Sequence, residues 1–187
     1  MTGDVAVEIA AAVRAREPVG GIRIVGVDGP SGSGKSHLAA RLASILDAPV
    51  IEIDDFVSWD CFAGWWPRFE EQVLGPLLAG RDARFQARDW SDWYGSSLGE
   101  WKTQPWAPTV ILEGVTCTRR DTIGRIAYAV WVDAPAELRL ARGMARDTTF
   151  AGKDELWRRW MAEEDEFFAA DGTRERADII VDTASYT

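Results

Sequence analysis

The chain has 187 residues, of which 47% are hydrophobic and 27% charged, which indicates one globular domain over residues 1–187 and excludes pervasive disorder. Its net charge of −9 disfavours nucleic acid as a partner, because nucleic-acid binding depends on clustered Lys and Arg. No apolar run approaches a membrane span and no signal core follows Met1, so we expect no membrane partner and a cytoplasmic location.

The first predicted elements lead into a glycine-rich loop. An amphipathic helix is expected from Val5 to Arg16 and a buried strand from Ile22 to Val27. The loop Gly29-Pro30-Ser31-Gly32-Ser33-Gly34-Lys35-Ser36 follows, and a helix from His37 to Leu46 comes after it. A strand before and a helix after is the context that supports a phosphate-binding loop over a chance glycine-rich turn.

The residues of this loop suit a nucleoside triphosphate. Glycines allow successive backbone N–H groups to turn inward, and the first helical turn places its partial positive end beneath the phosphates. Lys35 would reach the β/γ oxygens, and Ser36 would give its hydroxyl to Mg²⁺. We therefore predict ATP as a ligand and Mg²⁺ as its companion, with the nucleotide held by Gly29, Ser31, Gly32, Ser33, Gly34, Lys35 and Ser36.

A second strand, Val50 to Ile53, ends in two acids, Asp54 and Asp55. Open α/β sheets bind ligands beyond the carboxyl ends of their strands, so this position favours chemistry. Asp54 is placed to accept the proton of an attacking hydroxyl or to hold the Mg²⁺ shell, and Asp55 could instead cap the next turn. The alternative is that both are solvated loop acids.

The pattern loosens over residues 56–108, which hold seven of the ten tryptophans. A helix is expected from Pro67 to Leu78, a short strand from Ala83 to Gln86, and an aromatic, polar loop from Arg88 to Trp106. We interpret this stretch as a substrate-facing insertion. Indole faces stack on flat ligands, but large aromatics are also ordinary core material. The candidates for contact with an acceptor are Trp65, Trp66, Trp90 and Trp93.

Alternation of strands and helices resumes after the insertion. Further strands are predicted at Thr109 to Leu112, Tyr128 to Val132 and Asp178 to Val181, and helices from Pro135 to about Arg146 and from about Lys153 to Ala170. Strands that alternate with helices favour parallel βαβ units. The predicted fold is therefore α/β, a doubly wound, mostly parallel five-stranded sheet with helices on both faces.

Two further sets of charges belong to this C-terminal half. Glu113, at the end of its strand, could bind Mg²⁺ or orient the acceptor, or it could pair with Arg119 or Arg120. Arginines at 139, 142 and 146 share one helix face, where guanidinium groups could clamp phosphate oxygens. A solvated helix face is the alternative. Arg142 and Arg146 are the candidates we favour for stabilising the transferring phosphoryl group.

With these residues in place, the chain resembles the uridine kinase family of P-loop kinases from about Ile22 to Asp182. The resemblance rests on the glycine-rich loop, on Asp54-Asp55-Phe56, on Ile111-Leu112-Glu113-Gly114 and on the segment from Arg139 to Asp147. It implies that Asp54 is the catalytic base, that Phe56 lies beside the nucleoside, and that residues from about 139 to 153 form a lid. Arg88-Asp89-Trp90, followed by Trp93, stands where the family usually has other residues at the base pocket, and Arg88 is counted among the substrate candidates. Val57 stands where the family usually has a tyrosine after Asp-Asp-Phe.

The sequence therefore predicts an ATP-dependent, Mg²⁺-requiring kinase for a small-molecule hydroxyl, with a nucleoside such as uridine or cytidine as the first choice. Another small alcohol, a sugar or a nucleoside monophosphate are alternatives within the same chemistry. A nucleotide-binding module or slow NTPase without an acceptor is the alternative from another class. The expected partners are ATP and the acceptor, and a homo-oligomer is compatible with the sequence.

Overall fold

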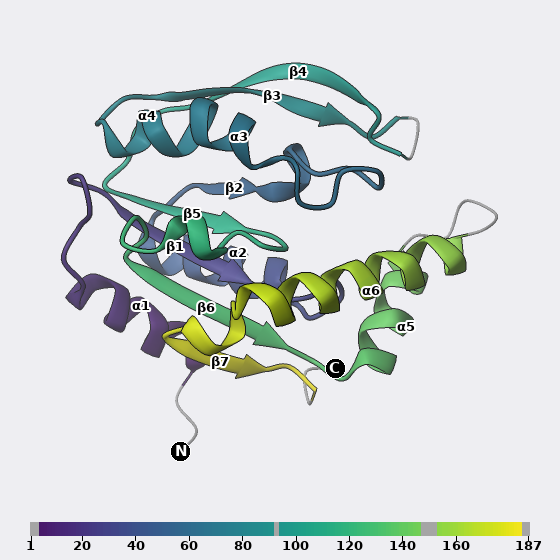
Figure 1. Cartoon of the computed structure of the whole chain (residues 1–187). Coiled ribbons are helices and arrows are strands. Elements are labelled where there is room, and N and C mark those ends of the chain that lie inside the picture. The colour runs from purple at the N-terminus through teal and green to yellow at the C-terminus, as the bar shows by residue number, and fades with distance from the viewer. Residues whose placement is uncertain (1–3, 92–93, 147–152, 185–187) are drawn as a thin grey trace.

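The computed structural model describes residues 4–91, 94–146 and 153–184. Its centre is a parallel sheet of five strands in the order β2-β5-β1-β6-β7 (Figure 1). The strands are β1 (Arg23–Asp28), β2 (Val50–Glu52), β5 (Thr109–Glu113), β6 (Tyr128–Asp133) and β7 (Ile179–Asp182). These strands lie within one or two residues of the predicted ones, so the predicted five-stranded α/β sheet is confirmed.

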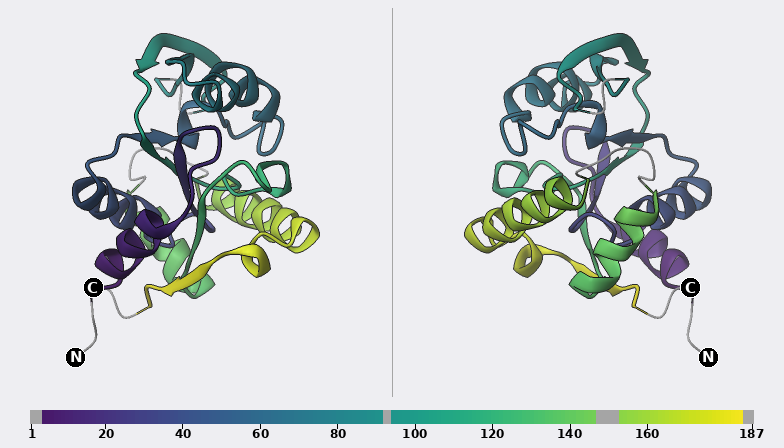
Figure 2. Two further views of the ribbon diagram at one scale, coloured as in Figure 1. Left: turned by 90° about the vertical axis from the view of Figure 1, so that its left-hand side faces the viewer. Right: turned by 90° about the vertical axis from the view of Figure 1, so that its right-hand side faces the viewer.

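Helices cover both faces of this sheet. Figure 2 shows α1 (Val5–Ala15) and α2 (Lys35–Leu46) on one side of the strands and α6 (Lys153–Asp171) on the other. Val25, Val27 and Ile111 face the first helix pair, whereas Ile24, Val110 and Leu112 face the opposite core. Successive residues of a strand point to opposite faces, so a strand covered on both sides is apolar throughout.

The insertion, residues 56–108, packs on the core that contains Ile24, Val110 and Leu112. It also forms a hairpin at the end of the molecule opposite β7 (Figure 1). Its strands are β3 (Ala83–Asp89) and β4 (Ser97–Gln104), paired antiparallel. The prediction of a loop from Arg88 to Trp106 was therefore wrong over β4. Most of β4 is exposed, so its sequence lacks the alternation that marks a half-buried strand, and the burial of Ala83, Phe85 and Ala87 on β3 anchors the pair.

The helix predicted from Pro67 to Leu78 exists, but it is not regular. It consists of α3 (Trp66–Phe69), a π-helical turn η2 (Glu70–Leu74) and α4 (Gly75–Leu78). Pro76 has no N–H to donate to the carbonyl one turn earlier, and its ring crowds that carbonyl. A wider turn just before the proline accommodates this break, and π turns of this kind are single-turn features.

Short turns and one further helix connect the strands. Three 3₁₀ turns are η1 (Ile53–Asp55), η3 (Arg120–Thr122) and η4 (Arg174–Arg176), and α5 (Ala136–Arg146) follows β6. Within the described ranges, no helix is long and apolar enough to cross a membrane. Cys61 and Cys117 are both free thiols.

Candidate active site

The glycine-rich loop lies where predicted, between β1 and α2, and packs tightly against its neighbours. A Cβ on Gly29 would stand 2.2 Å from the carbonyl oxygen of Val132, and one on Gly32 would stand 2.4 Å from that of Arg139. Both glycines also have positive φ, 138° and 76°, which side chains disfavour. The loop conformation therefore depends on these glycines.

Asp28, the last residue of β1, holds the loop from beneath. Its buried carboxylate accepts hydrogen bonds from the N–H groups of Gly29 (2.7 Å), Thr116 (2.8 Å) and Thr118 (2.7 Å), and from the Thr118 hydroxyl (2.9 Å). Burial raises the pKa of Asp28 to about 6, although the hydrogen bonds from Thr118 and Gly29 and the charge of Lys35 oppose the rise. The carboxylate thus ties the phosphate loop to the segment that follows β5.

A cavity of about 640 Å³ opens at the carboxyl ends of the strands. The loop contributes Ser31, Gly32, Gly34, Lys35 and Ser36 to its lining. Gly29 and Ser33 do not line it. Ser33 is fully buried, and its carbonyl oxygen accepts a hydrogen bond of 2.6 Å from the Thr183 hydroxyl, so it supports the loop from behind.

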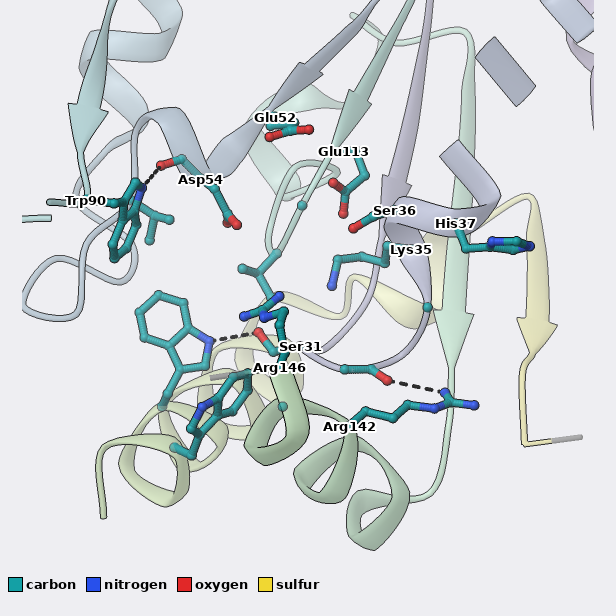
Figure 3. A pocket seen from close by; sticks show the side chains of 18 of the residues that line it. Ser31, Lys35, Ser36, His37, Glu52, Asp54, Trp90, Glu113, Arg142 and Arg146 are labelled. Carbon is teal, nitrogen blue, oxygen red and sulfur yellow. Dashed lines mark hydrogen bonds between the residues drawn. The ribbon is translucent and has the colours of Figure 1, made fainter. Parts of the chain in front are cut away.

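Lys35, Ser36 and Glu113 meet in this cavity (Figure 3). The ammonium group of Lys35 donates to the carbonyl oxygen of Pro30 at 3.0 Å, and Ser36 is hydrogen-bonded to the Glu113 carboxylate. Glu113 is 8% exposed. Burial raises its pKa from 4.5 to about 7, against the opposing charge of Lys35 and with the carboxylates of Asp54 and Glu52 adding to the rise.

The alternative partners considered for Glu113 are engaged elsewhere. Arg119 contacts Asp121 at 3.0 Å, and Arg120 donates to the carbonyl oxygen of Asp171 at 3.0 Å. Glu113 instead faces Ser36 and Lys35. A serine hydroxyl beside a carboxylate is a set of hard oxygen donors, of the kind that holds Mg²⁺ together with phosphate oxygens and water. The residues present therefore fit the ion.

Asp54, just before the insertion, and Trp90, in the turn between its two strands, meet at the cavity. Asp54 lies in η1 and points toward Lys35 and Ser36 in Figure 3. The indole N–H of Trp90, a residue 37% exposed, donates to the backbone carbonyl oxygen of Asp54 at 3.0 Å. Asp55 also lines the cavity and pairs with Lys102 of β4 at 2.7 Å. The hairpin thus holds both acids in place.

The three arginines of α5 meet three different environments. Arg139 is buried and contacts Glu164. Arg142 lines the cavity, but its guanidinium group donates to the carbonyl oxygens of Gly32 (3.3 Å) and Thr183 (3.2 Å), at the rear of the loop (Figure 3). Arg146 reaches the cavity with its guanidinium carbon 5.6 Å from the ring centre of Trp157. Arg139 is therefore not part of a solvated helix face, whereas Arg142 is half-buried and Arg146 is exposed.

Several predicted substrate residues lie outside the cavity lining. Phe56 and Trp65 are buried in the core, where their ring centres are 6.4 Å apart, and Trp66 packs beside them. Arg88 donates to the carbonyl oxygen of Phe56 at 2.9 Å. Of the predicted aromatic contacts, Trp90 is thus the one that lines the cavity within the described residues. Trp93 and residues 147–152 of the predicted lid lie outside those residues.

Sequence reasoning left out other lining residues, namely Glu52, Val57, Trp59, Val115, Trp157 and Trp160. The last two are three positions apart on α6, a spacing that shows which residues share a helix face. That spacing does not show which part of the molecule the face meets. His37 also lines the cavity, but its ring points away from Lys35 and Ser36 (Figure 3).

Comparisons with known proteins agree with this architecture. No family model matches the sequence, and a search of curated proteins found no significant match. Among solved structures, a protein from Bacillus stearothermophilus described as a possible uridine kinase has a TM-score of 0.70 at 19% identity, over 95% of this chain and 97% of that one. A candidate fructose transport system kinase from Silicibacter sp. TM1040 has a TM-score of 0.67 at 21% identity, over 95% and 99%. The chain therefore has the α/β fold of P-loop NTPases, in a form shared with kinase-like proteins.

Proposed function

We propose that this protein is a Mg²⁺-requiring kinase that transfers the γ-phosphoryl group of ATP to a hydroxyl of a small molecule. The observation that carries the proposal is the arrangement of one cavity, in which Asp54 faces Lys35 and Ser36. A slow hydrolysis switch needs no carboxylate and aromatic wall opposite its phosphate loop. A kinase needs both a phosphate cradle and a site where a hydroxyl meets a base.

Each group in this arrangement has a role in the proposed reaction. Lys35 and the loop amides hold the β/γ phosphates, and Asp54 accepts the proton of the attacking hydroxyl. Arg146, which lines the cavity, stabilises charge on the transferring group, while Arg142 supports the loop through Gly32. Most of the rate enhancement would come from positioning and electrostatics.

Mg²⁺ would be held by Ser36 and Glu113, and when bound it would supply positive charge that offsets the negative charge developing on the phosphates. Glu113 must be ionised to serve as a ligand. Its pKa of about 7 means that protons compete with the ion near neutral pH. We therefore expect the affinity for Mg²⁺ to rise between pH 6 and pH 8.

The charges of the cavity also support one class of acceptor over another. The loop and α5 contribute Lys35, Arg142 and Arg146, whereas the opposite side contributes Glu52, Asp54 and Asp55. Lys102 of β4 pairs with Asp55. A phosphorylated acceptor would be repelled by this acidic side, since like charges in a partly buried site repel. An uncharged alcohol such as a nucleoside or a sugar therefore fits better than a nucleoside monophosphate.

One structural neighbour is described as a possible uridine kinase and the other as a candidate fructose transport system kinase, and uridine and fructose both carry hydroxyl groups. We take a nucleoside as the first candidate, because Trp59 and Trp90 line the cavity and indole faces stack on bases. The test is ADP release with Mg·ATP and a panel of nucleosides, sugars and nucleoside monophosphates. Stimulation by an uncharged alcohol supports the proposal. Hydrolysis that no acceptor stimulates would favour a binding module or NTPase instead.

A further inference from the structure

Glu164 of α6 is a buried acid to which the proposed reaction assigns no role. Its side chain is completely buried. The Oε1 atom accepts hydrogen bonds from the backbone N–H of Ser31 (2.8 Å) and from the indole N–H of Trp160 (2.7 Å), and the Oε2 atom lies 3.4 Å from a guanidinium nitrogen of Arg139. A buried carboxylate is costly unless its oxygens are satisfied, and these contacts satisfy them.

The contact with Ser31 reaches the phosphate loop itself. Ser31 is the third residue of the loop and lines the cavity. Its N–H is held by Glu164, and its hydroxyl lies 3.0 Å from the indole nitrogen of Trp160. Because one carboxylate oxygen receives both N–H groups, the direction of the Ser31 peptide is linked to the position of the Trp160 ring.

The Trp160 ring also contacts the acceptor side of the cavity. Its centre is 5.2 Å from that of Trp59 in an edge-to-face arrangement. The neighbouring Arg159 donates to the carbonyl oxygen of Trp59 at 3.0 Å. Helix α6 thus holds Trp59 by a ring contact and by a backbone hydrogen bond, and it holds Ser31 through Glu164.

We propose that Glu164 is a positioning residue that links the phosphate loop, through Trp160, to Trp59 on the part of the cavity where the acceptor would bind. Binding of the nucleotide would then order the segment that carries Trp59. This inference rests on the proposed function, since it takes the loop to be the nucleotide site. The physical basis is that a shift of the Ser31 peptide on binding must move or hold the indole that shares its acceptor. The same indole packs on Trp59, and packed rings transmit small displacements.

The first experiment measures binding of Mg·ADP by calorimetry in variants at two neighbouring acids. Glu164→Ala removes the acceptor of both N–H groups and should weaken binding by about tenfold or more. Glu164→Gln keeps an oxygen that accepts from Ser31 and Trp160, so it should stay within about threefold of the parent chain even if its unfolding temperature falls. Glu163→Ala is the matched control, because Glu163 is partly exposed and forms a surface pair with Arg159 at 3.7 Å.

A role limited to the ion pair with Arg139 would make the Gln and Ala variants equally weak, and that result would overturn the proposal. Parent-like binding by the folded Glu164→Ala variant would do the same. If Glu164→Ala fails to fold, the proposal is decided by the second experiment, which uses Trp160→Phe. This variant retains a ring for Trp59 but loses the indole N–H that joins Glu164.

The second experiment follows hydrogen exchange in residues 57–62 of the parent chain and of Trp160→Phe, with and without Mg·ADP. We expect the nucleotide to slow exchange in this segment of the parent chain, and this effect to disappear in Trp160→Phe although Mg·ADP still binds. Equal protection in both proteins, or none in the parent chain with Mg·ADP bound, would overturn the link. Failure of the parent chain to bind Mg·ADP would instead overturn the proposed function on which the link rests.

Discussion

Replacing Glu113 by glutamine removes a charge that the fold holds at a cost. The side chain is 8% exposed, and its pKa is raised from 4.5 to about 7, mainly by burial. At 1.36 kcal/mol per pH unit, that rise corresponds to about 3 kcal/mol of unfolding free energy. Glutamine has nearly the shape of the protonated acid and carries no charge, so it should recover this free energy wherever Glu113 would be ionised.

The sign of the effect depends on pH. Below pH 4.5 the acid is protonated in both the folded and the unfolded chain, so the variant and the parent chain should be equally stable. Between pH 4.5 and about 7 the unfolded chain loses its proton first, and the parent chain loses stability relative to the variant. Above pH 7 the full difference of about 3 kcal/mol remains, which raises the unfolding midpoint of the variant by about 6–12 °C for a chain of this size.

Urea unfolding at pH 4, 6 and 8 measures this difference directly, with Glu71→Gln as an exposed control. The same variant should lose the Mg²⁺ dependence of ADP binding, since an amide is a poorer ligand for the ion. A stability difference between the parent chain and Glu113→Gln that does not change with pH would refute the reasoning, because burial of the charge would then not govern its pKa.

Asp54→Asn should keep Mg·ATP binding and lower acceptor-dependent turnover by about 10²–10⁴-fold, whereas Asp55→Asn should cost far less; unchanged turnover in the former would remove Asp54 as the base. Trp65→Ala should lower the unfolding free energy by about 3–5 kcal/mol in urea, because the ring is 2% exposed in the core. If the variant instead changed the KM for the acceptor and left the unfolding free energy unaltered, Trp65 would have to be assigned to the substrate site. Gly32→Ala should abolish Mg·ADP binding in calorimetry and destabilise the fold by about 1–3 kcal/mol, since φ is 76° and the new Cβ would meet the Arg139 carbonyl; parent-like binding would contradict this view of the loop.

The parallel sheet and the phosphate loop could be predicted because their determinants are local. A parallel strand covered on both faces is a continuous apolar run, as in Val110 to Leu112, and the loop is a short motif between two such elements. Strand β4 could not be predicted in this way. Its residues are mostly exposed, and its position depends on pairing with β3. Pairing between segments leaves no periodic pattern in the sequence of an exposed strand.

The roles of single buried acids were also beyond local reasoning. Asp28 stabilises the loop by contacts with residues 88 and 90 positions away, and Glu164 does so across 133 positions. Each acid follows or lies within an ordinary element, and its type alone suggests a solvated surface. For the tryptophans, the sequence predicts that they pack but not where each one lies. Their abundance predicts aromatic packing, but Trp65 in the core and Trp59 at the cavity have the same chemistry, and the fold alone separates them.

The arginines of α5 show how one helix face can serve several purposes. Arg139, Arg142 and Arg146 are three and four positions apart, so they rise along the same side of the helix. The phosphate loop crosses that side at the level of Gly32, whose carbonyl oxygen accepts from Arg142. Arg139, one turn before Arg142, contacts Glu164, and Arg146, one turn after it, lines the cavity. Arg142 thus holds the loop directly and Arg139 holds it through Glu164, and in the proposed reaction the charge of the transferring group would fall to Arg146.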